Sequence, residues 1–305
     1  MQNPAELKKF SLEDKKIFDK AYSTLKFPLA EHSFSWLYIW DSPDTDTAWT
    51  EINGNLCLFC TFEGSRHVWG PVLPGNKLKE TLKICFEICE EYNSEKGFKE
   101  KPKVTYIPEE LKEKYENVGG YVLKEQNQDY IYNCINIIEL KGDKYKSKRN
   151  LRNYFLKNYE SKVEDYDKEV HFNDCLELLK RWEKRKLESI GNGDEDRLDY
   201  EVYANKKILE LVNKLNVDGI VVYVDGKIEG YTFGEKTNER LFTVFFEKTN
   251  LDVKGLSVYV YSEFLKRMDC KVVNAGEDWG VEYLKKIKMS YHPSQIRKSY
   301  MLQKK

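Results

Sequence analysis

The chain repeats one order of predicted elements, and this repeat limits the folds open to it more than any other feature. Each half opens with two apolar segments joined by a tight-turn dipeptide, Asn53-Gly54 in the first half and Asp225-Gly226 in the second, which is typical of β-hairpins. The first half predicts strands at 48–52, 56–62 and 67–69, a helix at 77–93, a strand at 103–107, a helix at 108–116 and a strand at 121–124. The second half predicts strands at 217–224, 227–235 and 240–248, a helix ending at 268, a strand at 271–275, a short helix and a last strand. We therefore expect an α+β protein with a duplicated domain, each copy a mixed, mostly antiparallel twisted sheet flanked by helices.

The length and composition fit two ordered domains. A chain of 305 residues is long enough for two domains that each bury a core. Aromatic residues make up 14% of the chain, which is too many for a disordered protein. The net charge of −1 hides an asymmetry: residues 1–140 hold 17 Lys and Arg against 23 Asp and Glu (−6), and the remainder holds 33 against 28 (+5). The second half is thus the better place to look for a phosphate-bearing partner, although a solvated helix surface explains most of these charges.

The cysteines and the N-terminal sequence indicate a cytoplasmic protein. The seven cysteines are odd in number and lie within apolar patterns, so we expect reduced thiols. Cys57 and Cys60 have the spacing of zinc ligands, but alternation along a strand places them on opposite faces, and we expect no metal. The N-terminal residues do not resemble a signal peptide, and no apolar run approaches the length of a membrane span.

The most basic part of the chain follows the predicted domain junction. A strand is expected at 130–140, the junction at 131–142, and the domains at 1–130 and 131–305. Residues 141–162 then hold eight Lys and Arg against two acidic residues, and we expect a helix there with Ser147 as its N-cap. Two further helices are predicted at 173–187 and 199–215, with a loop at 191–194 between them.

Five motifs, spread from residue 145 to residue 293, carry a family resemblance. The predicted order of elements, a mostly antiparallel sheet that continues strand–helix–strand–helix–strand, resembles that of the Gcn5-related N-acetyltransferase (GNAT) fold, and the motifs narrow the resemblance further. The motifs are Tyr145-Lys146-Ser147-Lys148-Arg149-Asn150, Phe246-Glu247-Lys248, Gly255, Asn274-Ala275-Gly276-Glu277-Asp278-Trp279-Gly280 and Lys288-Met289-Ser290-Tyr291-His292-Pro293. Together they resemble the soluble, largely uncharacterised family related to the C-terminal catalytic domain of phosphatidylglycerol lysyltransferases, over nearly the whole chain.

The resemblance implies two tandem acetyltransferase-like domains and transfer of an acyl or aminoacyl group to an amine or a hydroxyl. Aminoacyl-tRNA is the donor in the better-known relatives and a possible donor here. Acyl-CoA is a doubtful donor, because the glycine-rich turn that holds its pyrophosphate in this fold is reduced to Gly255 and Ser257. Asp252 adds a negative charge where phosphates would approach, which Lys254 offsets in part.

The resemblance and the element ends together nominate a site in the second domain. The candidate catalytic residues are Glu247, Glu277 and Tyr291. The two carboxylates could accept a proton from the attacking group, and the tyrosine could protonate the leaving group. The candidate residues for binding the donor or the substrate are Lys148, Arg149, Asn150, Lys248, Lys254, Gly255, Asn274 and Asp278.

Structural roles compete with each of these assignments. Lys148 and Arg149 could pair with Glu247 or Glu277 instead of phosphate, and Asp278 could cap the helix that follows it. The first domain lacks the basic segment, so we expect it to be structural. The rival function is a non-catalytic binding protein that uses the duplicated fold to hold a small anionic metabolite or RNA.

Overall fold

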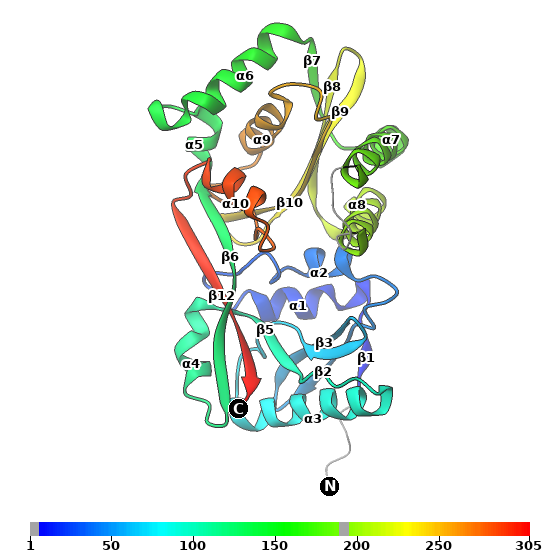
Figure 1. Ribbon diagram of the computed structural model, residues 1–305, viewed down its shortest axis with the longest axis vertical. Coiled ribbons are helices and arrows are strands. Elements are labelled where there is room, and N and C mark those ends of the chain that lie inside the picture. Colours follow the sequence, from blue (N-terminus) through cyan, green and yellow to red (C-terminus); the bar gives the residue numbers. More distant parts are fainter. Residues whose placement is uncertain (1–5, 189–194) are drawn as a thin grey trace. The chain divides into compact units, whose positions relative to one another are not determined.

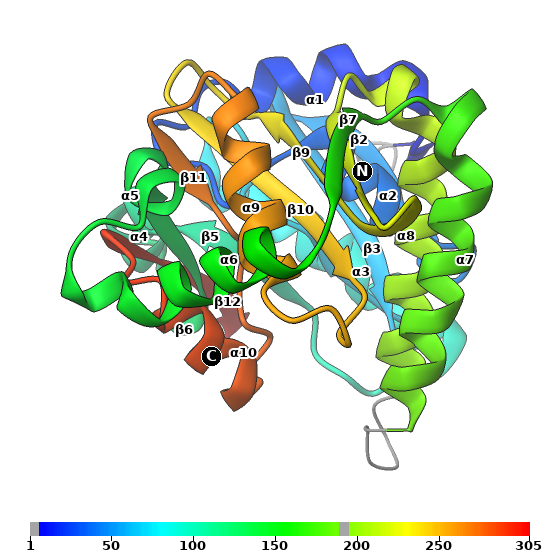
Figure 2. The ribbon, with the colours of Figure 1, turned by 90° about the horizontal axis from the view of Figure 1, so that it is seen from above.

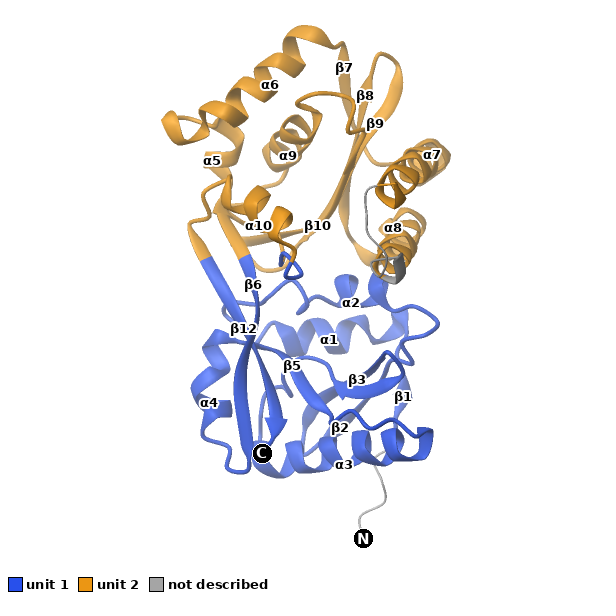
Figure 3. Cartoon of the chain, in the orientation of Figure 1, with its two compact units in different colours: residues 1–129, 277–280, 296–305 blue, residues 130–276, 281–295 orange. Residues whose placement is uncertain are grey.

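The computed structural model describes residues 6–188 and 195–305, and it divides the chain into two compact units. Unit 1 consists of residues 1–129, 277–280 and 296–305, and unit 2 of residues 130–276 and 281–295 (Figure 3). The chain thus returns to unit 1 twice after most of unit 2 has been formed. The loop predicted at 191–194 lies outside the described residues.

The sheet of unit 1 has the strand order β1-β2-β3-β4-β5-β12-β6. Its neighbours are antiparallel wherever their registers are described, except for the parallel pair β4 and β5. Both Asn53 and Gly54 have positive φ, as a tight hairpin turn requires, so the predicted hairpin between β2 and β3 is confirmed. The strands are β1 (Lys8–Lys9), β2 (Ala48–Ile52), β3 (Asn55–Phe62), β4 (Ser65–Val68), β5 (Lys103–Pro108), β6 (Tyr121–Asn133) and β12 (Gln295–Lys304).

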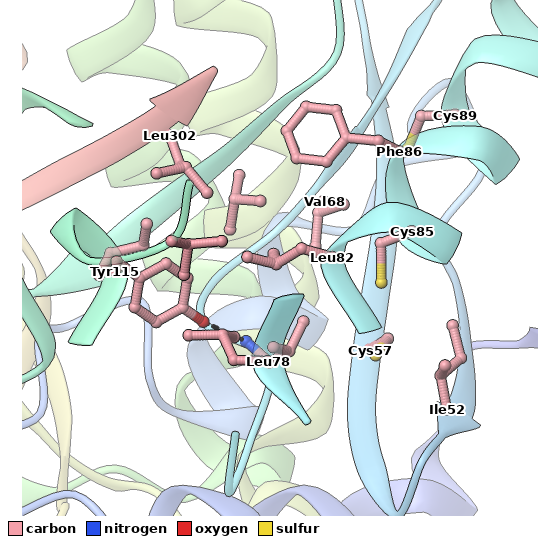
Figure 4. Close-up of a cluster of buried hydrophobic side chains, with 14 of the residues drawn as sticks. Ile52, Cys57, Val68, Leu78, Leu82, Cys85, Phe86, Cys89, Tyr115 and Leu302 are labelled. Carbon is pink, nitrogen blue, oxygen red and sulfur yellow. Dashed lines mark hydrogen bonds between the residues drawn. The ribbon is translucent and has the colours of Figure 1, made fainter. Parts of the chain in front are cut away.

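The main core of unit 1 lies between this sheet and helix α3. Leu82, Cys85 and Phe86 project from α3 and are fully buried against Cys57 of β3 and against Leu302 of β12 (Figure 4). The helices of this unit are η1 (Leu12–Asp14), α1 (Lys15–Tyr22), α2 (Phe34–Trp40), α3 (Leu78–Lys96), η2 (Glu109–Leu111) and α4 (Lys112–Glu116). The apolar spacing of α3 therefore serves packing, and its two cysteines are core residues.

The sheet of unit 2 has the order β6-β11-β10-β9-β8-β7, and β6 contributes its last residues to it. The neighbours are antiparallel apart from β10 and β11, which run parallel. Asp225 and Gly226 form the second predicted hairpin, again with positive φ at both positions. The strands are β7 (Ser161–Asp165), β8 (Asp218–Val224), β9 (Lys227–Lys236), β10 (Leu241–Thr249) and β11 (Val272–Asn274).

Helices cover both faces of the unit 2 sheet. α9 lies on one face of β8–β10, and α7 and α8 lie on the other (Figures 1 and 2). Phe155 of α6 packs with Leu256 and Val260 of α9 in the core on the first face. The helices are α5 (Cys134–Glu139), η3 (Asp143–Tyr145), α6 (Lys146–Asn158), α7 (Lys168–Leu187), α8 (Glu195–Leu215), α9 (Leu256–Arg267) and α10 (Glu282–Met289).

Three local predictions are wrong. The strand expected at 130–140 ends at Asn133, and α5 follows it. Ser147 lies inside α6 and not at its N-cap, because the helix begins one residue earlier. Cys134 and Cys270 are joined by a disulfide, so the prediction of reduced thiols fails for this pair.

Candidate functional site

The candidate site of unit 2 lies where β10 extends beyond its parallel neighbour. β10 and β11 are paired from Leu241 to Thr243, and β11 then ends at Asn274, whereas β10 continues to Thr249. The register of β10 against β9 also shifts between Val244 and Phe246, which marks a bulge in this stretch. The end of β10 is therefore a place where side chains are not enclosed by a strand on each side.

Glu247 projects from this end of β10 onto the first turn of α9. Its carboxylate accepts a hydrogen bond of 2.5 Å from the Ser257 hydroxyl, which is the second residue of that helix. Burial raises the pKa of Glu247 from 4.5 to about 7, against the opposing effects of Ser257, Lys148 and Lys248. A carboxyl group with a pKa near neutrality can both accept and return a proton at physiological pH.

Lys148 and Tyr291 complete the group around Glu247. The Nζ atom of Lys148 lies 4.0 Å from the centre of the Tyr291 ring. Burial lowers the pKa of Lys148, whereas the charge of Glu247 raises it. Burial and, to a lesser extent, Glu247 raise the pKa of Tyr291, so its phenol stays protonated. Three predicted site residues from α6, β10 and the segment after α10 thus share one electrostatic environment.

Lys248 points to the opposite face of β10. Its side chain is buried, forms an ion pair with Glu201 of α8, and lies 3.7 Å from the ring centre of Trp182 on α7. Burial lowers the pKa of Lys248, and the ion pair with Glu201 opposes that effect. Alternation along the strand accounts for its separation from Glu247. Its predicted contact with the donor stays a prediction.

Arg149 is engaged with backbone carbonyl groups. Its Nη1 atom donates to Leu140 at 2.5 Å and to Gly142 at 3.0 Å, and so holds the segment that follows α5. Asn150 and Lys254 are exposed, and Lys254 lies 4.6 Å from the ring centre of Tyr154. Their donor-binding roles stay predictions.

Gly255 is required by close packing as well as by backbone conformation. Its φ is +87°, and a Cβ atom at this position would lie 2.1 Å from the carbonyl oxygen of Leu151 in α6. The glycine therefore lets α9 approach α6, whether or not the loop binds phosphate. Asp252, which argued against an anionic ligand here, forms an ion pair with Arg185, so its charge is compensated.

The remaining predicted residues are Asn274, Glu277 and Asp278. Glu277 and Asp278 belong to unit 1, whereas Lys148, Glu247 and Tyr291 belong to unit 2. Asp278 accepts a hydrogen bond of 2.9 Å from the backbone N–H of Gly280. Asn274 is buried and accepts a hydrogen bond of 2.8 Å from Gly276, so both side chains stabilise local turns.

Ser257 is the participant that the sequence did not single out. In the sequence it stands where the glycine-rich turn has its second small residue. Its position two residues after Gly255, on the first turn of a helix, could have suggested a hydroxyl facing the end of β10.

The structure also bears on surface hollows, metal-binding groups and membrane-spanning helices. A surface hollow of about 370 Å³ lies at β7 and β8 and contains none of the predicted site residues; it is lined by Glu160, Ser161, Lys162, Glu164, Tyr223 and Gly226. In the part of the chain that the structure describes, no group of three or more His, Cys, Asp or Glu side chains could hold a metal ion. Within the same residues, no helix combines the length and the apolar character needed to cross a membrane.

Comparison with known proteins gives one family match and several structural matches. Residues 23–303 match the family described as phosphatidylglycerol lysyltransferase, C-terminal. No curated protein shows significant similarity to the sequence. A conserved protein of unknown function from Bacteroides thetaiotaomicron is 25% identical, with a TM-score of 0.86 over 99% of this chain and 100% of that one.

Two further solved structures bear on the fold. L-PGS from Bacillus licheniformis is 17% identical, with a TM-score of 0.65 over 97% of this chain and 93% of its own. A tandem GNAT protein from the clavulanic acid biosynthesis pathway is 10% identical, with a TM-score of 0.53 over 98% of each chain. These matches confirm the predicted fold of tandem acetyltransferase-like domains.

Proposed function

We infer that this chain, which belongs to the phosphatidylglycerol lysyltransferase C-terminal family, transfers an acyl or aminoacyl group to an amine or a hydroxyl. The observation that carries this proposal is Glu247, a carboxyl group with a pKa of about 7 at the end of β10, beside Lys148 and the protonated Tyr291. Carboxyl groups with a pKa near the working pH are suited to general acid–base catalysis.

The proposed reaction needs one proton acceptor and one proton donor. The acceptor amine or hydroxyl attacks the carbonyl carbon of the donor ester, and Glu247 takes the proton that the nucleophile loses. The bond between the carbonyl carbon and the leaving oxygen breaks, and the leaving oxygen takes a proton from the Tyr291 phenol. The proton held by Glu247 then restores the phenol, by way of solvent, so the transfer consumes no net proton.

We propose an aminoacyl-tRNA as the donor. Lys146 and Lys254 are exposed cations on α6 and in the loop before α9, and Tyr154 offers an exposed ring between them in sequence. Cations interleaved with an accessible aromatic ring suit the phosphates and the unpaired bases of an RNA 3′ end. The family name supports the same donor class, because lysyltransferases move an amino acid.

The test is a transfer assay with radiolabelled lysyl-tRNA as donor and either phosphatidylglycerol micelles or a panel of amines as acceptor. We expect labelled product from the native chain, and a rate lower by about 10²–10⁴-fold for Glu247→Gln, the range typical of a lost general base. Glu282→Gln, which changes a carboxylate on α10 that is 71% exposed, is the matched control and should keep the native rate.

The pH dependence separates catalysis from binding. Because the base must be ionised, the native rate should fall below about pH 7. Equal rates for the native chain and for Glu247→Gln would refute the proposed role. Saturable, salt-sensitive binding of tRNA without transfer to any acceptor would favour the non-catalytic RNA-binding protein instead.

A further inference from the structure

Four of the six tryptophans lie in unit 1 in one continuous row of rings that ends on Tyr106. Trp279 contacts Trp40 edge to face at 5.5 Å, and Trp40 lies 5.6 Å from Trp36, measured between ring centroids. Trp36 stacks on Trp69 at 6.2 Å, and Trp69 lies 4.6 Å from Tyr106. All five residues are partly exposed, so this aromatic row (Trp36, Trp40, Trp69, Tyr106 and Trp279) is not simply part of the core.

The backbone is adapted to present this row. Trp36 and Trp40 are one turn apart on α2, and Trp69 directly follows β4. Tyr106 and Trp279 have φ values of +52° and +53°, which are rare for aromatic residues and cost conformational energy. Strained backbone of this kind tends to be kept at functional positions.

Buried polar groups hold the strained Tyr106 in place. The Nδ1 atom of His32 accepts a hydrogen bond from the backbone N–H of Leu29. The ring hydrogen is therefore on Nε2, which donates to the Tyr106 carbonyl at 2.8 Å. The Tyr106 N–H donates to Gln126 at 2.9 Å. Burial lowers the pKa of His32 to about 4, so the ring stays neutral in this structural role.

Carboxylates gather at the Tyr106 end of the row. Burial is the main reason why the pKa of Tyr106 is raised, and Glu277, Glu31 and Asp129 add to the increase through their negative charge. Asp129 accepts the backbone N–H of Ala30 at 2.9 Å, which fixes the segment that carries Glu31. Three carboxylates therefore lie near this end of the row, and Arg297 offsets part of the charge of Asp129.

We propose that the aromatic row of unit 1 binds the ammonium group of a small organic cation. The faces of indole and phenol rings attract cations, and tryptophan does so most strongly. Carboxylates beside the rings add attraction for the same charge and repel anions. This site goes beyond the transfer reaction proposed for unit 2, and it gives unit 1 a binding role where the sequence suggested a purely structural one.

Binding of n-pentylammonium to the whole chain, followed by tryptophan fluorescence and calorimetry, tests the proposal. Its uncharged counterpart 1-pentanol and the anion pentanoate are the ligand controls. We expect saturable binding of the cation, at least about tenfold tighter than of 1-pentanol. Absence of saturation, or equal affinity for cation and alcohol, would overturn the proposal whatever the outcome of the transfer assay.

Variants locate the site. Trp69→Leu and Glu31→Gln should each weaken binding of n-pentylammonium by about tenfold, whereas Trp69→Phe keeps a ring and should retain most of the affinity. Trp49→Phe changes a buried tryptophan of unit 1 outside the row and should bind as the native chain does. Circular dichroism establishes that each variant is folded. Native affinity in folded Trp69→Leu would show that the row is not the site.

Discussion

Replacing Glu247 with glutamine should stabilise the protein, and the gain should grow as the pH rises. Burial raises the pKa of this carboxyl group from 4.5 to about 7 in the native state. Between pH 4.5 and about pH 7 the native state therefore binds more protons at Glu247 than the unfolded state does. The contribution of Glu247 to the free energy of unfolding therefore falls as the pH rises through this window, and glutamine removes the loss.

The magnitude follows from the two pKa values. A pKa difference of about 2.5 corresponds to about 3 kcal/mol between the two protonation states. Because Glu247 is partly exposed, solvent screening reduces this, and we expect Glu247→Gln to gain on the order of 2 kcal/mol at pH 8. At pH 4, where the carboxyl group is protonated in the native state and mostly protonated in the unfolded state, the variant and the native chain should be nearly equal in stability.

Denaturant unfolding between pH 4 and pH 8 measures the effect. Glu282→Gln is again the control, because it makes the same substitution at an exposed carboxylate of α10. A difference for Glu247→Gln that is constant with pH would refute the argument. If Glu247→Gln instead became less stable than the native chain as the pH rises, the sign of the argument would be wrong. That outcome requires the ionised Glu247 carboxylate to stabilise the folded state.

Three further outcomes follow from the packing of unit 2. In denaturant unfolding, Gly255→Ala should lower the free energy of unfolding by at least about 2 kcal/mol more than Gly142→Ala does. Both glycines have φ near +88°, but only at Gly255 does a Cβ atom meet a backbone carbonyl, so equal losses would contradict the collision. Lys248→Met should lower the free energy of unfolding by about 3 kcal/mol, because it leaves Glu201 partly buried without its ion pair. Adding Glu201→Gln should recover most of this loss in the same measurement. Calorimetric titration should give acetyl-CoA an affinity weaker than low micromolar, because a carboxylate from β10 already faces the first turn of α9; low-micromolar binding would refute this.

Local sequence signals predicted most of the fold. The two hairpins were predictable because Asn53-Gly54 and Asp225-Gly226 favour positive φ, which depends only on neighbouring residues. Residues 134–139 include three isoleucines, which favour a strand, but the segment forms α5 and buries Cys134 and Ile137 on one face. That outcome depends on packing against α9, which no short window of sequence contains.

The site was predictable only in part for the same reason. Lys148, Glu247 and Tyr291 were nominated from motifs, and the structure brings these three together. The face to which Lys248 points required the register of β10, and the carbonyl partners of Arg149 required the end of α5. The disulfide joins residues 136 positions apart, a separation for which the spacing of cysteines gives no signal.

The position of β12 has a consequence for how the chain is made. β12 is hydrogen-bonded between β5 and β6, yet its residues 295–304 are synthesised after all of unit 2. Until β12 has been synthesised, β5 and β6 therefore each have an unpaired edge in the middle of the future sheet of unit 1. Such edges are prone to pair with other chains. Synthesis of residues 295–304, and not completion of residues 1–129, is the event that lets the sheet of unit 1 close, so chaperone demand should last until β12 has been made and has paired with β5 and β6.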